Sequence, residues 1–210
     1  MARAQILPAG QTQMAPMAKD PLDILTPQGY LSEVMDDPSL EVVMNLFKIP
    51  RAFAVSGFGD WSVGRHCFCV AWLALYWSRF RGYDEATRNR LVVMGLSHDL
   101  HEAATGDILP GLKNPELKAR LDEIQSRFLK GLDIAFEDSL HADLKALDMM
   151  AFMFEIRQAA VLDQEQGERL EGFFSRQKAA LLEFAATNRM EGVEGFLEKT
   201  GLGRMAERGS

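Results

Sequence analysis

The sequence predicts an all-α fold, and three observations support this prediction. Apolar residues recur at intervals of three and four through most of the chain, which would place them on one face of each helix. No segment alternates polar and apolar residues as a half-buried strand does. A chain of 210 residues, 47% of them hydrophobic, can enclose one core. We expect a single helical domain over residues 21–210 and a flexible segment over residues 1–20, where apolar runs are scarce.

Candidate capping residues and chain breaks separate the expected helices. Ser39 is placed to cap a helix that reaches Leu46, and Ser62 to cap one that reaches Arg81. Glycine and proline interrupt the chain over 49–61, which favours a loop. In all, helices are expected at 27–36, 39–46, 62–81, 84–106, 115–132, 141–164, 168–187 and 191–200.

The charge balance excludes two classes of partner. The chain has 23 basic and 30 acidic residues and a net charge of −7, so it lacks the general attraction to duplex DNA or to an anionic membrane. The longest apolar run, Cys67 to Trp77, would span about 16 Å as a helix, roughly half of a bilayer core. We interpret this run as a buried helix. A small anionic substrate remains compatible with a locally positive pocket.

Cysteine usage bears on the compartment. The two cysteines, Cys67 and Cys69, would point to different sides of one helix and do not form a disulfide framework. No signal peptide is visible near the start of the sequence. These observations predict a reducing compartment, and hence a cytoplasmic protein.

A small set of histidines and carboxylates indicates a metal site. His98, Asp99 and Glu102 follow one another closely, and on a helix Glu102 would share a face with the other two. His66 lies within an apolar helix, and Asp148 lies in an apolar run where an unpaired carboxylate is costly. Imidazole and carboxylate together suit a divalent first-row metal.

Simpler interpretations exist for each residue taken alone. His66 could be a hydrogen-bonded core histidine, and Asp148 could pair with Lys145 or Arg157. Asp143 is an alternative acidic ligand on the same expected helix, although its neighbours are more polar. The order of the whole set along the chain is what favours the metal site.

Four segments of the chain resemble the HD-domain metal-dependent phosphohydrolases, most specifically the bacterial 5′-deoxynucleotidase branch that includes phage dATP triphosphohydrolases. They lie within about residues 45–165 and read IPR at 49–51, SVGRHCFCVA at 62–71, HDLHEAATGDILPGLK at 98–113 and LD at 147–148. The resemblance implies an HD-domain helical bundle, a nucleotide substrate and a homo-oligomer in which the long C-terminal helices could contribute an interface.

The resemblance also implies roles for individual residues. His66, His98, Asp99 and Asp148 would bind one divalent metal ion. Two imidazoles and two carboxylates suit Co, Mn, Zn, Fe or Ni, with Mg possible. Glu102 would orient or deprotonate the attacking water, and Asp107 would orient the sugar or protonate the leaving 5′ oxygen.

The expected substrate contacts come from four further residues. Arg51 and Lys113 would supply positive charge for phosphate, with Arg51 free of any packing role. Trp61 fits the core more simply, but it lies in the expected loop near Arg51 and is therefore the best candidate for stacking on the base. Ala52 stands where the branch often has tryptophan. Arg65, where the branch often has glutamate, would favour a longer phosphate chain. Both departures leave the base and sugar specificity open, and the number of phosphates is open as well.

The expected function is therefore cleavage of the 5′ phosphate ester of 2′-deoxynucleotides, either from a monophosphate or as tripolyphosphate from a dNTP. One alternative is an HD phosphohydrolase or phosphodiesterase acting on another nucleotide or phosphate ester. The other is a helical interaction protein with a decayed metal site, which an intact ligand set and Glu102 argue against.

Overall fold

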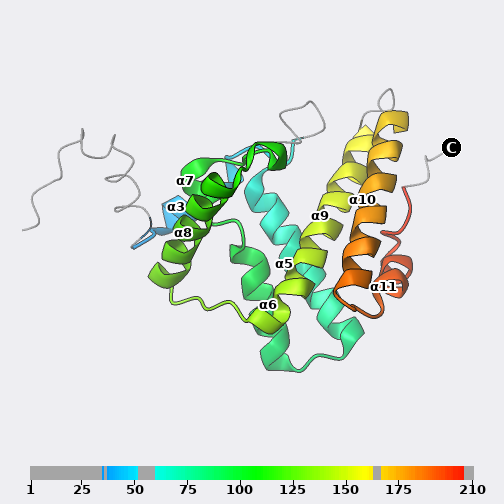
Figure 1. Ribbon diagram of the computed structural model, residues 1–210, viewed down its shortest axis with the longest axis horizontal. Helices are drawn as coiled ribbons and strands as arrows, with labels where there is room; N and C mark the ends of the chain where they lie inside the picture. Colours follow the sequence, from blue (N-terminus) through cyan, green and yellow to red (C-terminus); the bar gives the residue numbers. More distant parts are fainter. Residues whose placement is uncertain (1–34, 36, 52–59, 163–166, 206–210) are drawn as a thin grey trace, which may run out of the picture.

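The structure is a computed structural model that describes residue 35 and residues 37–51, 60–162 and 167–205 (Figure 1). The expected flexible segment 1–20 lies outside the described residues, as does nearly all of the expected helix 27–36. Within the described residues there is no strand, only an isolated bridge between Pro50 and Ser62. The all-α prediction is confirmed.

Three long helices form the centre of the molecule (Figure 1). Helix α5 (Val63–Arg81) packs against α6 (Glu85–Ser97) and α9 (His141–Leu162). Helices α10 (Gly167–Thr187) and α11 (Val193–Thr200) lie on one side of them. The other side carries α3 (Leu40–Met44), α7 (Glu102–Thr105) and α8 (Pro115–Gly131). Short 3₁₀ helices η1, η2 and η3 occupy Asn45–Phe47, Pro110–Leu112 and Asp138–Leu140.

The helix starts have clear local causes. The side chains of Ser39, Ser62, Asp84 and Asn114 each accept a hydrogen bond from a backbone N–H three residues on, which satisfies one donor that a helix start leaves free. Gly82 ends α5 at a φ of 69°, a left-handed conformation that glycine adopts without strain.

Helix α5 contributes to two hydrophobic clusters. Val63 and Cys67 belong to a smaller cluster with Met35 and Leu46, whereas Trp77 belongs to the main core with α6, α9, α10 and α11. His66, in the first turn of α5, is as buried as these apolar neighbours. Within the described residues, none of the helices is long and apolar enough to cross a membrane.

The expected helix over 84–106 is wrong, because the chain breaks into two helices. Helix α6 ends at Ser97, and tight turns with hydrogen bonds between residues three apart lead to α7. Gln125 of α8 stabilises this break: its amide donates to the carbonyl of Ser97 at 2.7 Å and accepts from the backbone N–H of His101 at 2.9 Å. His98 and Asp99 therefore lie in a turn between α6 and α7.

Candidate metal centre

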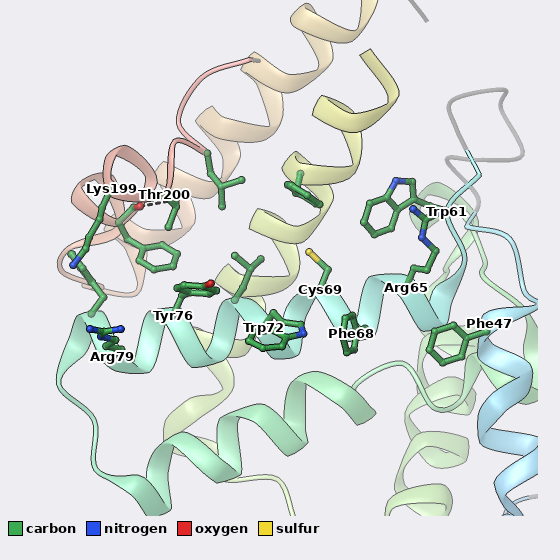
Figure 2. Close-up of a pocket in the computed structure, with 15 residues that line it drawn as sticks. Phe47, Trp61, Arg65, Phe68, Cys69, Trp72, Tyr76, Arg79, Lys199 and Thr200 are labelled. Carbon is green, nitrogen blue, oxygen red and sulfur yellow. Dashed lines mark hydrogen bonds between the residues drawn. The ribbon is translucent and has the colours of Figure 1, made fainter. Parts of the chain in front are cut away.

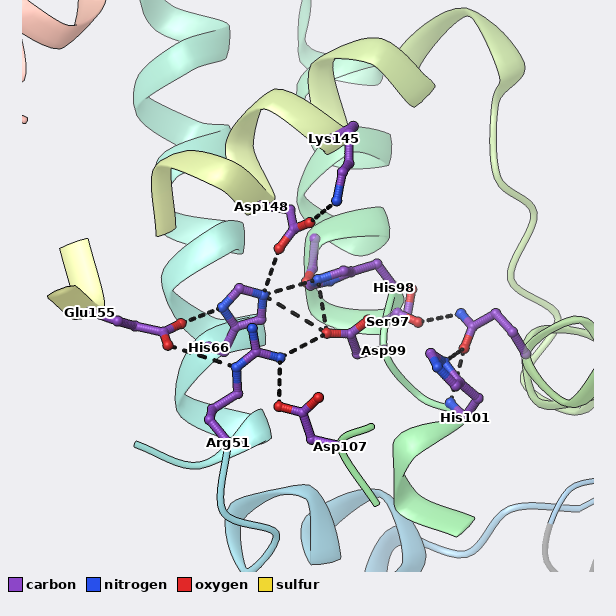
Figure 3. A network of polar contacts seen from close by, with 12 residues as sticks. Arg51, His66, Ser97, His98, Asp99, His101, Asp107, Lys145, Asp148 and Glu155 are labelled. Carbon is purple, nitrogen blue, oxygen red and sulfur yellow. Dashed lines mark hydrogen bonds and ion pairs between the residues drawn. The ribbon is translucent and has the colours of Figure 1, made fainter. Parts of the chain in front are cut away.

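Four predicted ligands converge from three parts of the fold (Figure 3). His66 comes from α5, His98 and Asp99 from the turn after α6, and Asp148 from α9. Nε2 of His66 lies 3.3 Å from Nε2 of His98, 3.1 Å from Oδ1 of Asp148 and 3.8 Å from Oδ2 of Asp99. Nε2 of His98 lies 3.3 Å from the same oxygen of Asp99. Ligand atoms around one ion bound at about 2.0–2.2 Å have such separations.

Both imidazole rings are oriented by their other nitrogen. Nδ1 of His98 is 2.9 Å from the carbonyl oxygen of Gly95, which can only accept, so this nitrogen donates. Nδ1 of His66 is 2.6 Å from Oε1 of Glu155. In both rings Nε2 therefore faces the cluster. A metal-binding histidine usually has such a partner on its second nitrogen, so the donor set fits a divalent ion.

The cluster has the electrostatics of a cation site. Burial lowers the pKa of His66, but hydrogen bonds with Asp148 and Glu155 outweigh it and raise the pKa to about 9. Burial acts to raise the pKa of Asp148, but the hydrogen bond and charge of His66 together with the charges of Lys145 and His98 hold it well below its ordinary value. A proton on His66 thus balances the carboxylates, and a bound cation would take its place.

Cys67 is a further donor near His98 and Asp99. Burial, together with the charges of Asp99 and Glu102, holds the pKa of its thiol well above the ordinary value. A protonated thiol is a poor metal ligand. The charges of the cluster therefore favour the imidazole and carboxylate set.

A carboxylate oxygen of Glu102 lies within 4.8 Å of possible ligand atoms of Asp99 and His101. Glu102 is 2% exposed, and its Oε2 has no hydrogen-bond partner among the described residues. Burial and the charges of Asp99 and Asp107 raise its pKa to about 9, while Arg51 and Lys113 act to lower it. A buried polar oxygen without a protein partner is placed to bind water or substrate.

Arg51 faces three carboxylates. Its backbone N–H donates to the carbonyl of Trp61 at 2.9 Å, which holds Arg51 beside the start of α5. Residues 52–59 of the expected loop lie outside the described residues. Its Nη1 lies 3.3 Å from Asp107 and 3.7 Å from Asp99, and its Nε lies 3.7 Å from Glu155. The side chain is 14% exposed. Arg51 therefore does have a structural role, contrary to expectation, because it neutralises buried carboxylates.

Two predicted substrate residues lie elsewhere. Trp61 packs edge-on against Phe154, and the guanidinium of Arg65 lies over its ring while pairing with Asp60 at 2.7 Å. Both line one end of an apolar groove of about 790 Å³ along α5, with Arg79 and Lys199 at the other end (Figure 2). Their role in substrate binding stays a prediction.

Asp148 meets both interpretations offered by the sequence. Its Oδ2 pairs with Lys145 at 2.6 Å, as the simpler interpretation proposed, while Oδ1 faces His66. Asp143, the alternative ligand, instead accepts hydrogen bonds from Trp77 and Tyr83 at 2.8 Å each. Arg157 donates to the carbonyl of Gly201.

Sequence reasoning missed Glu155. It lies two helical turns after Asp148 in the apolar segment AFMFEI, and its side chain is 0% exposed. The signal was present, because an acidic residue inside an apolar helical run needs a buried partner. The 3.6-residue period places Glu155 on the face of Asp148.

A family model described as an HD domain matches residues 50–193, more than half of the chain. The protein belongs to the HD-domain family. The cyanophage S-2L HD phosphohydrolase DatZ, solved with dA and one catalytic Zn²⁺ ion, has a similar fold: the TM-score is 0.50 at 17% identity, over 75% of this chain and 97% of that one. A comparison with curated proteins gives no significant match. Membership of the HD-domain family supports a hydrolase with a metal-binding site, and the structural likeness supports the fold.

Proposed function

We propose that the protein is a divalent-metal-dependent phosphohydrolase that cleaves the 5′ phosphate ester of 2′-deoxynucleotides. The observation that carries the proposal is the convergence of His66, His98, Asp99 and Asp148 beside Glu102 and Arg51. The deoxynucleoside bound to DatZ supports the substrate class. The sequence resemblance to 5′-deoxynucleotidases supports the bond that is cleaved.

The chain's own residues divide the reaction between them. When bound, the ion supplies a water of lowered pKa and polarises a phosphoryl oxygen. Arg51 binds the phosphate with its terminal N–H groups, and Lys113 adds positive charge near Glu102. Glu102 orients the attacking water and accepts its proton. Asp107, beside Arg51, orients the sugar or donates a proton to the leaving 5′ oxygen.

Metal removal and a substrate panel test this function together. We expect chelation to abolish phosphate release and Co²⁺, Mn²⁺ or Zn²⁺ to restore it, because the four ligands would otherwise lack the ion. The restored enzyme should be assayed with dNMPs, dNTPs, the matching ribonucleotides and a nucleotide-free phosphate ester. Chromatography that separates phosphate from tripolyphosphate identifies the bond cleaved.

The outcomes are distinct. Deoxynucleotide hydrolysis that depends on metal supports the proposal. Hydrolysis only of other esters would assign the same site to a different substrate. Full activity in protein shown to be metal-free by elemental analysis would end the proposed mechanism.

Arg51 gives a more local prediction. Arg51→Ala should lower kcat/KM by about 10- to 150-fold, the range expected when charge-assisted hydrogen bonds worth roughly 1.5–3 kcal/mol are lost. Arg51→Lys should lose less, because lysine keeps the charge without the planar fork. Arg90→Ala, which removes an exposed partner of Glu137, is the control. Circular dichroism must confirm folding, since Arg51 also neutralises buried carboxylates; an unaltered kcat/KM in folded Arg51→Ala would contradict the phosphate role.

A further inference from the structure

Glu155 contacts two parts of the candidate site, the predicted metal ligand His66 and the predicted phosphate-binding residue Arg51. Its Oε1 accepts the hydrogen bond from Nδ1 of His66 at 2.6 Å, and its Oε2 lies 3.7 Å from Nε of Arg51. The carboxylate faces the imidazole and the guanidinium from the side opposite Asp99 (Figure 3). One side chain on α9 thus reaches a predicted metal ligand and the predicted phosphate-binding residue.

The partners of Glu155 argue against a purely structural role. A fully buried carboxylate is costly unless opposite charges or donors face it. Oε2 has no hydrogen bond among the described residues, so the guanidinium of Arg51 supplies its compensating charge. Among residues 35, 37–51, 60–162 and 167–205, the ion pairs of Glu155 are to His66 and Arg51, and both partners belong to the candidate site.

We propose that Glu155 is a positioning residue that couples the metal site to the phosphate site. By accepting from Nδ1, it holds the ring of His66 with Nε2 toward His98 and Asp148. By pairing with Nε of Arg51, it keeps the guanidinium beside the metal site, where the terminal N–H groups that now face Asp107 and Asp99 would turn to substrate phosphate. The second half of this proposal rests on the proposed function, whereas the first half needs only the metal.

Each half follows from general chemistry. A carboxylate on the far nitrogen of a ligating histidine fixes the ring and makes the ligand more basic, and its loss usually weakens metal binding by about 10–100-fold. A guanidinium is a rigid fork, so anchoring Nε determines where its other donors point.

The first experiment measures metal affinity without any reaction. Zn²⁺ and Co²⁺ are titrated into metal-free protein in competition with a chromogenic chelator. Glu155→Gln keeps the side-chain shape and removes the charge, and should weaken binding by about 10–100-fold. The control is Asp143→Asn, on the same helix and also buried, whose partners Trp77 and Tyr83 lie outside the cluster. It should lower the melting temperature while leaving metal affinity unchanged.

The second experiment measures the phosphate half with inorganic phosphate and calorimetry on metal-loaded protein. Glu155→Gln should weaken phosphate binding in the wild-type background and add little in the Arg51→Ala background, because the effect passes through Arg51. Equal losses in the two backgrounds would overturn the coupling.

Metal affinity in Glu155→Gln equal to that of the wild type, or an equal loss in Asp143→Asn, would overturn the positioning role. If Glu155→Gln does not fold, Glu155→Asp can replace it, because aspartate keeps the charge but retracts it by one methylene. Metal and phosphate affinities of Glu155→Asp equal to those of the wild type would then overturn the proposal. These binding measurements stand whether or not deoxynucleotides are hydrolysed, so failure of the proposed function and failure of this inference are distinguishable.

Discussion

Replacing Asp148 by alanine should remove the metal and reduce phosphate release to background. Asp148 would supply one of four ligand atoms, and its Oδ1 lies 3.1 Å from Nε2 of His66. Removing a residue that only hydrogen-bonds to a metal ligand usually weakens metal binding by about 10–100-fold. Removing a ligand itself should weaken metal binding by more than this. Elemental analysis after dialysis and a phosphate-release assay on the same preparation measure both effects.

Lys145→Ala is the matched control for Asp148. This lysine pairs with the other carboxylate oxygen at 2.6 Å and is largely exposed, so the ion pair is worth little to stability. Metal content and activity should therefore survive its removal. If Asp148 were only the partner of Lys145, the two variants would behave alike. Retention of a full equivalent of metal by Asp148→Ala would exclude Asp148 as a ligand.

The convergence of the four predicted metal ligands could be anticipated from sequence because most of them are local anomalies. His66 and Asp148 are polar residues in apolar helical runs, and the pair His98-Asp99 is followed by Glu102. A buried polar side chain is costly unless another group compensates it. Several such residues in one chain therefore indicate that they are partners of one another or of a common ion. The structure then brings them within ligand distance.

What could not be predicted depends on contacts between distant segments. The break after Ser97 is stabilised by Gln125 of α8. The helix propensities of the residues around Ser97 do not reveal this break. Glu155 showed the same anomaly as Asp148, but the packing of α5 against α9 decides which one meets which nitrogen of His66. The place of Trp61 against Phe154 likewise follows from tertiary packing.

Glu102→Gln should reduce turnover by about 10²–10⁴-fold, the usual contribution of a positioned acid or base. In the metal-free protein the pKa of Glu102 is about 9, owing to burial and then to the negative charges of Asp99 and Asp107. A dication bound to Asp99 adds positive charge beside Glu102 and so favours its ionised form. We therefore expect Glu102 to become a competent base only in the loaded site, and metal content in Glu102→Gln to stay near the wild-type value.

The raised pKa of Glu102 also predicts how the stability of the metal-free protein depends on pH. Folded, metal-free protein holds a proton on Glu102 that the unfolded chain releases at its ordinary, lower pKa. Stability should therefore fall as the pH rises from roughly 4.5 toward 9. Glutamine mimics the protonated form, so metal-free Glu102→Gln should melt at a higher temperature than the wild type at pH 8, with the difference shrinking toward pH 5.

Scanning calorimetry across this pH range and single-turnover kinetics at saturating metal separate the possible roles of Glu102. If Glu102 is a base, Glu102→Gln should be more stable without metal, bind metal normally and turn over slowly. If Glu102 is a metal ligand, Glu102→Gln should lose the ion as Asp148→Ala does. A merely structural carboxylate gives a stability change with normal turnover, and that result would remove Glu102 from the mechanism.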